Sequence, residues 1–132
     1  MLNGLPILVV EDEPLLALNL VMAIEDNDGL AIGPVSTVAE AMALVETQKI
    51  VAAILDANLL DRDVTPLALA LIERLIPFVI HSGTGLPEEL ARQYPDLPVI
   101  IKPARSTFVL AALLQQLSPD RSMFENRRMF EN

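Results

Sequence analysis

Acidic side chains end two apolar segments of this chain, and together they have the composition of a metal-binding cluster. Segment 5–10 is followed by the acidic triplet 11–13, and segment 51–55 is followed by Asp56. If these segments form neighbouring strands, their carboxylates lie close together at one rim of a sheet. Carboxylates that close raise one another's pKa unless a cation lies between them. Hard oxygen ligands suit Mg2+, and one carboxylate can then act as a nucleophile.

The residues at four predicted strand ends suit phosphoryl transfer to a carboxylate. Asp56 is the expected nucleophile, because carboxylates form aspartyl-phosphates. Asp12 and Asp56 are expected to bind Mg2+ directly, with Glu11 acting through a water molecule. Lys102 supplies a mobile positive charge for carboxylate or phosphoryl oxygens. Ser82 supplies a hydroxyl hydrogen bond to the phosphoryl group.

Strand-like and helix-like segments alternate along the chain. Short apolar runs predict strands over 5–10, 30–35, 51–55, 77–81 and 97–101. The intervening patterns predict helices near 14–28, 37–48, 65–75, 87–93 and 106–117. Five such pairs, with strands apolar on both faces, predict an α/β fold in which helices cover both faces of a parallel sheet.

Two of the predicted helices are apolar nearly all round, over 14–24 and 108–114. A helix on the outside of a sheet needs only one apolar face. Either neighbouring loops bury these helices more deeply, or they offer a docking face or a homodimer face to another protein.

The composition indicates one globular domain without disulfides. The chain has 132 residues, 52% of them hydrophobic, and no cysteine. No apolar stretch is long enough to span a membrane and no signal peptide is recognisable, so we expect a cytoplasmic protein that does not enter a membrane. A net charge of −9 argues against nucleic acid as a partner. The polar residues 119–132, in which Met-Phe-Glu-Asn occurs twice, are expected to form a flexible tail.

The order of these motifs resembles the receiver domain of two-component response regulators, as in the chemotaxis regulator. The segments that carry the resemblance are Val9-Val10-Glu11-Asp12-Glu13-Pro14, Ile54-Leu55-Asp56-Ala57-Asn58-Leu59, Ile80-His81-Ser82-Gly83 and Ile101-Lys102-Pro103. The similarity extends from about Leu5 to Leu117, and residues 1–118 are expected to form the domain.

The resemblance implies a doubly wound, five-stranded parallel sheet in the order 2-1-3-4-5, flanked by helices. It implies that Asp56 accepts phosphate from a sensor histidine kinase or a phosphotransfer protein, and that an unidentified output protein reads the result. Asn58 then lends its backbone carbonyl to Mg2+, and the peptide bond between Lys102 and Pro103 is cis. The chemistry is self-phosphorylation and self-dephosphorylation, not metabolic catalysis.

The chain also departs from the family pattern at two positions. The first acid is Glu11, where the family usually has Asp, and we expect altered Mg2+ affinity. The switch aromatic normally found three positions before the lysine falls on Val99. The region 77–83 is similar to a receiver subgroup with a Phe-Ala-Thr-Gly motif and an altered switch.

Simpler roles compete for several of these residues. Asp12 could cap the helix that begins at Pro14, and Ser82 could be an ordinary loop serine. His81 is expected to pack in the core or at its rim, not to act as a ligand. Asp61 and Asp63 are expected to be solvated loop acids or a helix cap.

Three functions remain open beside a phosphorylation-dependent switch. A phosphate sink would draw phosphate from a shared kinase and need no output face. A pseudo-receiver would bind a partner without phosphorylation. A hydrolase of the haloacid-dehalogenase type also uses a strand-end aspartate, but it requires a second aspartate where this chain has Asn58.

Overall fold

The computed structural model describes residues 2–117, and the tail predicted over 119–132 lies outside this range. The strands are β1 (Pro6–Val10), β2 (Leu30–Val35), β3 (Ala52–Asp56), β4 (Phe78–Ser82) and β5 (Val99–Ile101). The helices are α1 (Pro14–Asp26), α2 (Val38–Thr47), α3 (Thr65–Glu73), α4 (Glu88–Gln93) and α5 (Ser106–Leu117). Each predicted element is therefore present, with ends that differ by a few residues.

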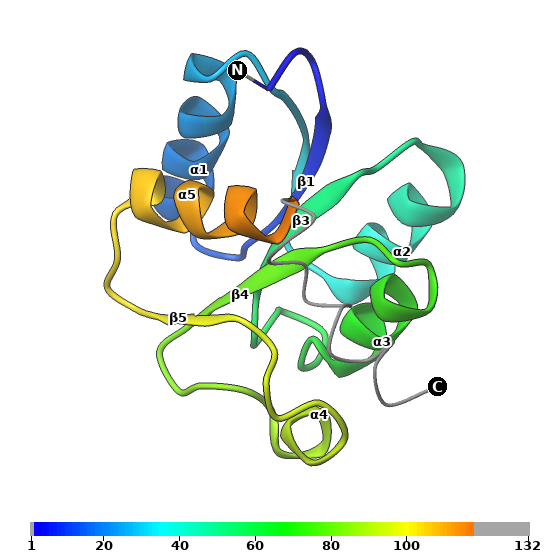
Figure 1. The fold of residues 1–132 in the computed structure, drawn as a ribbon. Coiled ribbons are helices and arrows are strands. Elements are labelled where there is room, and N and C mark those ends of the chain that lie inside the picture. Colours follow the sequence, from blue (N-terminus) through cyan, green and yellow to red (C-terminus); the bar gives the residue numbers. More distant parts are fainter. Residues whose placement is uncertain (1, 118–132) are drawn as a thin grey trace.

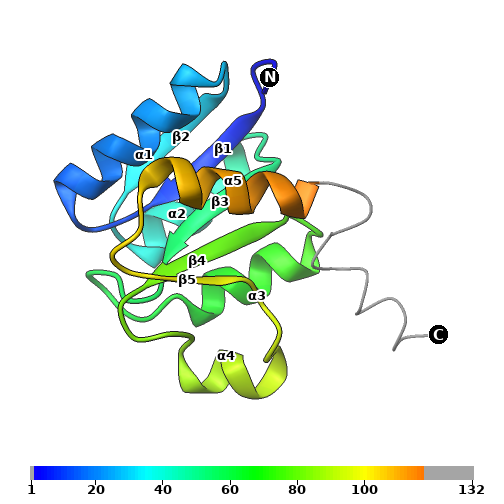
Figure 2. The same ribbon diagram turned by 60° about the vertical axis from the view of Figure 1, so that its left-hand side comes forward.

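The five strands form one parallel sheet in the order β2-β1-β3-β4-β5. Helices α1 and α5 lie side by side on one face, and α2, α3 and α4 cover the other (Figures 1 and 2). This arrangement confirms the doubly wound α/β sheet and its strand order. Because all strands run the same way, their carboxyl ends meet at one rim.

The core consists of two apolar layers, one on each face of the sheet. Alternate residues of a strand point to opposite faces. In β3, Ala53 and Leu55 belong to the layer under α2 and α3, whereas Ala52 and Ile54 belong to the layer under α1 and α5. Strands β3 and β4 are buried along their whole length. Asp56 and Ser82 are the last residues of these buried strands, so the core fixes their positions.

Local backbone geometry ends two helices earlier than the apolar pattern suggests. The helix expected over 14–28 ends at Asp26, because Asp28 adopts a left-handed conformation with φ of 64°. The helix expected over 65–75 ends at Glu73, and Leu75 has φ of 57°. The strand expected from residue 97 begins at Val99, since Pro98 has no amide hydrogen for the ladder.

Helix starts follow the predicted signals. Pro14 is the first residue of α1 and Pro66 lies in the first turn of α3. The hydroxyl of Thr37 accepts a hydrogen bond of 3.0 Å from the Glu40 amide and donates one of 2.9 Å to the Glu40 carboxylate. The predicted capping pair at the start of α2 is therefore confirmed.

The two apolar helices each keep part of their apolar surface in solvent. In α1, Leu15, Leu18 and Met22 are exposed, while Leu20 and Ile24 are buried. In α5, Phe108 is exposed although Val109, Leu110 and Leu113 are buried. Deeper burial by loops is therefore the wrong interpretation for the exposed members of this set.

Candidate functional site

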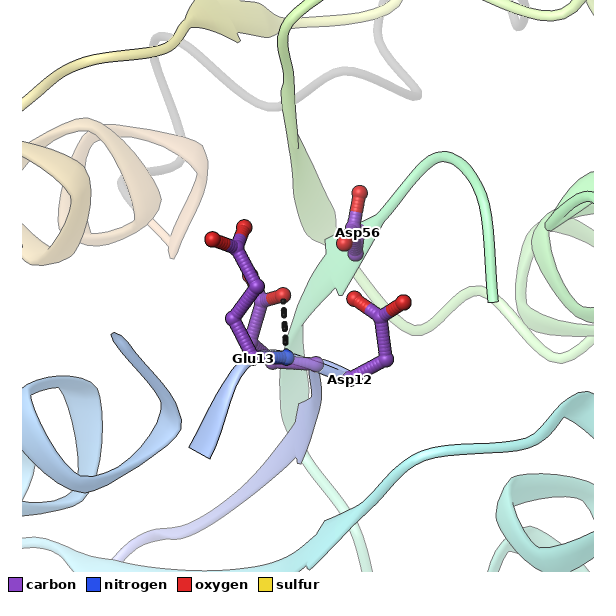
Figure 3. A group of neighbouring side chains, drawn as sticks. Asp12, Glu13 and Asp56 are labelled. Carbon is purple, nitrogen blue, oxygen red and sulfur yellow. Dashed lines mark hydrogen bonds between the residues drawn. The ribbon is translucent and has the colours of Figure 1, made fainter. Parts of the chain in front are cut away.

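Strand pairing brings the acidic triplet and Asp56 to the same rim of the sheet. Val10 in β1 is paired with Leu55 in β3, so the residues that follow them emerge side by side. One oxygen from each of Glu11, Asp12, Glu13 and Asp56 lies within 4.8 Å of the others. Figure 3 shows the Asp12 carboxylate turned toward Asp56, with Glu13 directed away from Asp12.

Glu11 is the most deeply buried acid of this cluster, with 3% of its surface exposed. Its Oε2 accepts a hydrogen bond of 3.2 Å from the Glu13 amide, drawn dashed in Figure 3. Its Oε1 is buried without a hydrogen bond within the described residues, although the Lys102 ammonium lies 3.4 Å away. Burial, followed by the proximity of Asp56, raises the pKa of Glu11 to about 8.

The neighbouring acids respond differently to the same crowding. Burial would raise the pKa of Asp56, but hydrogen bonding with Glu11 and Asp12 and the charge of Lys102 outweigh it and lower that pKa. The pKa of Asp12 is raised, first by burial and then by its interaction with Asp56. Of Glu11, Asp12 and Asp56, Asp56 therefore holds its negative charge most firmly.

Lys102 is the cation of the cluster. Its ammonium lies 2.9 Å from Glu13 Oε2, 3.2 Å from Asp56 Oδ2 and 3.4 Å from Glu11 Oε1. Burial disfavours its charge, but the contacts with Glu13, Glu11 and Asp56 prevail and raise the pKa of Lys102. The Lys102–Pro103 peptide bond is cis, as predicted.

The donor set fits a hard divalent cation. Four carboxylates face one ammonium, so the cluster keeps an excess of negative charge. All the side-chain atoms that could bind a metal are carboxylate oxygens. One of them, the buried Oε1 of Glu11, accepts no hydrogen bond from the described residues. These properties fit a hard divalent cation such as Mg2+.

Ser82 lies at the same rim but its hydroxyl is engaged with its own loop. Its Oγ donates a hydrogen bond of 2.9 Å to the Gly85 carbonyl and accepts one of 3.0 Å from the Thr84 amide. Gly85 has φ of 83°, a conformation that suits glycine. Contact between Ser82 and a group on Asp56 thus requires the loop 83–85 to change its hydrogen bonds.

Asn58 lies two residues beyond Asp56, in the loop between β3 and α3. The backbone amide of Asn58 donates a long hydrogen bond of 3.4 Å to Asp56 Oδ1. Asn58 also forms an isolated antiparallel bridge with Asp63. The structure therefore places the backbone of Asn58 beside the acid cluster.

His81 is buried, as predicted. It is 1% exposed, and neither ring nitrogen has a hydrogen-bond partner in the part of the chain that the structure describes. Burial and then the charge of Lys102 lower its pKa. His81 is therefore a neutral imidazole that packs in the core next to the site.

Among the acids near the site, the sequence did not predict the partner of Glu13, and it offered a helix cap as one of two roles for Asp61 and Asp63. Glu13 belongs to the acidic triplet expected in the metal cluster, but its carboxylate accepts a hydrogen bond from the Lys102 ammonium. Asp61 caps α2 across the chain, through bonds to the Val38 and Ala39 amides, while Asp63 caps the start of α3 through the Thr65 amide. Asp61 lies five positions after Asp56, and nothing in the sequence indicates that it caps a helix that begins more than twenty positions earlier.

Comparison with solved structures identifies the relatives of this chain. SdrG from Sphingomonas melonis Fr1 is 42% identical, and the match covers 86% of this chain and 99% of SdrG with a TM-score of 0.70. A response regulator receiver protein from Sinorhizobium medicae WSM419 is 26% identical, with 89% and 97% coverage and a TM-score of 0.75. The sequence matches no family model and no curated protein.

A third structure shares the fold at lower identity. The receiver domain of the sensor histidine kinase PA1611 from Pseudomonas aeruginosa PAO1 is 19% identical over 83% of this chain and 94% of that domain, with a TM-score of 0.70. That domain has a magnesium ion coordinated in its active-site cleft.

A parallel sheet in the order 2-1-3-4-5 with acids at its carboxyl rim defines the class of CheY-like receiver domains. The chain belongs to the response-regulator receiver family. Its role is that of a response regulator in two-component signalling, a system of histidine kinases, phosphotransfer proteins and output proteins. Among residues 2–117, no helix is both long and apolar enough to cross a membrane.

Proposed function

We propose that Asp56 accepts a phosphoryl group from a histidine kinase or a phosphotransfer protein, and that the change alters a protein-binding surface. The observation that carries the proposal is the environment of Asp56, a buried carboxylate with a lowered pKa, 3.2 Å from Lys102 Nζ. Such a group is ionised at neutral pH and can attack phosphorus. The bond from phosphorus to the donor nitrogen breaks as the bond to an Asp56 oxygen forms.

Asp12 and Asp56 would hold Mg2+ directly, Glu11 through a water molecule, and Asn58 through its backbone carbonyl. Bound Mg2+ would neutralise charge on the phosphoryl oxygens and on the acid cluster. Lys102 would exchange part of its contact with Glu13 and Asp56 for a phosphoryl oxygen. Ser82 would donate its hydroxyl to another oxygen and release the Gly85 carbonyl, which moves the loop 83–85.

Amide NMR with Mg2+ and then beryllofluoride, a phosphoryl mimic, tests this function. The chain has no tryptophan for fluorescence. We expect shifts at Asp12, Asp56, Ser82 to Gly85 and Lys102 in the wild-type protein. Asp56→Asn should abolish the beryllofluoride response, whereas the matched variant Asp63→Asn in the same loop should retain it.

A response that survives in Asp56→Asn contradicts the assignment of the nucleophile. A folded wild-type protein that responds to neither addition contradicts the whole proposal. The acids are then structural, and binding of a partner without phosphorylation becomes the better account.

A phosphate sink is the second candidate. The part of the structure formed by α4 and β5 favours it. Helix α4 has only six residues, and Val99, half-buried in β5, occupies the position of the family's switch aromatic. A sink predicts rapid loss of the phosphoryl group and no partner that binds only the phosphorylated form. Finding such a partner would exclude it.

A further inference from the structure

The loop that carries Asn58 is a narrow turn with a defined tip. Asn58 and Asp63 pair as an antiparallel bridge, and inside it the Leu59 amide donates a hydrogen bond of 3.1 Å to the Arg62 carbonyl. Leu60 and Asp61 therefore form the tip of this turn. The base of the turn lies beside Asp56, which accepts the Asn58 amide.

The tip of the turn is attached to the start of α2. Asp61 Oδ1 accepts a hydrogen bond of 2.8 Å from the Val38 amide, and Oδ2 accepts one of 3.1 Å from the Ala39 amide. The Leu60 amide donates a bond of 3.1 Å to the Ser36 carbonyl. Three hydrogen bonds thus join a loop of the site to a segment more than twenty residues earlier.

The Asp61 carboxylate occupies both of its oxygens in this attachment. Helix α2 already has its own cap, since Thr37 satisfies the Glu40 amide. Asp61 accepts hydrogen bonds from the Val38 and Ala39 amides, which the Thr37 side chain does not bind. The hydrogen bond from Val38 is the main cause of the lowered pKa of Asp61. A cap that comes from a distant loop fixes that loop as well as the helix.

We propose that Asp61 is a positioning residue of the phosphoacceptor site, which holds the Asn58 backbone in place by anchoring the tip of its turn to α2. This inference rests on the proposed function, because it assigns Asn58 a part in binding Mg2+. A turn closed by the bridge between Asn58 and Asp63 transmits a displacement at its tip to its base. Loss of the anchor therefore moves or loosens the Asn58 carbonyl while Asp12 and Asp56 stay in place.

The test is the Mg2+ dissociation constant of Asp61→Ala, measured by amide NMR at Asp12 and Asp56. Loss of a group that orients a metal ligand commonly weakens binding by a factor of ten or more, and we expect roughly a tenfold increase here. Asp61→Asn keeps one carbonyl acceptor and should lie between Asp61→Ala and the wild-type protein.

Two controls separate positioning from helix stability and from charge. Thr37→Ala removes the other cap of α2 without touching the turn, and its Mg2+ affinity should stay within about twofold of wild type. Glu40→Gln removes one negative charge from a side chain that lines the same cavity of about 520 Å³ as Glu11 and Asp12. Its affinity should change less than that of Asp61→Ala.

Wild-type affinity in Asp61→Ala overturns the inference, and so does an equal loss in Thr37→Ala or Glu40→Gln. If Asp61→Ala does not fold, Asp61→Asn decides: a loss beyond that of Glu40→Gln supports the inference, and none overturns it. A wild-type protein that ignores Mg2+ removes the proposed function and this inference together. A wild-type response with unchanged Asp61→Ala affinity removes only the inference.

Discussion

The ammonium of Lys102 lies 3.2 Å from Oδ2 of Asp56, although 46 positions separate the two residues in the chain. The same ammonium contacts Glu13 at 2.9 Å. Lys102, which directly follows β5, thus contacts acids at the carboxyl ends of β1 and β3. Its charge compensates part of the repulsion that folding creates at this rim.

Replacement of Lys102 by Met should lower stability and tighten Mg2+ binding. Loss of the partly buried cation leaves four close carboxylates, and we expect the free energy of unfolding to fall by about 1–3 kcal/mol without Mg2+. The affinity for Mg2+ should rise, because the cluster loses its internal cation. Urea unfolding with and without Mg2+ measures both effects.

Lys49→Met is the control for this prediction, because Lys49 is the other lysine of the chain and is exposed. It should change neither quantity by a measurable amount. Equal behaviour of the two variants would show that Lys102 has no special part in the cluster.

Stability without Mg2+ should fall as pH rises toward 8, because of Glu11. Its folded-state pKa of about 8 exceeds the ordinary value of 4.5 for a glutamate, so its proton stabilises the folded state fully below about pH 4.5, and this contribution is lost progressively as the pH rises to about 8. We expect a loss of about 1–3 kcal/mol, since neighbouring carboxylates share the proton. Glu11→Gln should remove most of this pH dependence. A wild-type slope retained in Glu11→Gln would assign the effect to another group.

Mg2+ should stabilise the folded protein through Asp12. A ligand that binds only the folded state adds roughly 2.7 kcal/mol to the free energy of unfolding at 100 times its dissociation constant. The midpoint temperature of thermal unfolding should therefore rise when Mg2+ is added and fall back to its original value when a chelator removes the ion. Asp12→Asn should lose most of the shift.

Asp28→Asn removes an equal charge at the opposite end of the sheet, before β2, and tolerates the same left-handed backbone. It should keep the full Mg2+ shift. A shift of the same size in both variants would contradict the placement of the metal at Asp12.

Ser82→Ala should weaken the beryllofluoride response more than Mg2+ binding. The variant lacks the hydroxyl that would donate to the phosphoryl oxygen, and it also frees the Thr84 amide. Hydrogen exchange at Thr84 should accelerate. Ser82→Thr keeps the hydroxyl and should restore both properties, while its failure to do so would point to packing at this fully buried position.

In the apolar helix α1, substitution by alanine should destabilise the protein strongly at a buried position and hardly at all at an exposed one. Leu20 is 1% exposed and Leu15 is 73% exposed. Leu20→Ala should cost about 2–5 kcal/mol of stability, whereas Leu15→Ala should change it by at most about 0.5 kcal/mol. Urea unfolding distinguishes them, and a large cost at Leu15 would mean that another surface covers it in solution.

The sheet and the cluster of acids were predictable because both follow from apolar runs that end in polar residues. The strand order required a family resemblance, since alternation alone does not say which strands are neighbours. Contacts between side chains were harder to predict from the sequence. The contacts of Glu13 with Lys102 and of Asp61 with α2 depend on loop paths that no periodicity encodes. The early ends of α1 and α3 arise at Asp28 and Leu75, and of these two residue types only aspartate favours a left-handed backbone.

The three carboxylates around Lys102 should also make its amine slow to react with electrophiles. Acylating reagents attack the unprotonated amine, and Lys102 is held protonated with only 18% of its side chain exposed. Lys49 is exposed, so it should acquire such a label first. A cation that displaces Lys102 from the acids would expose a second reactive lysine. The ratio of labelling at the two lysines, read by mass spectrometry, would then report the occupancy of the site in an unmodified chain.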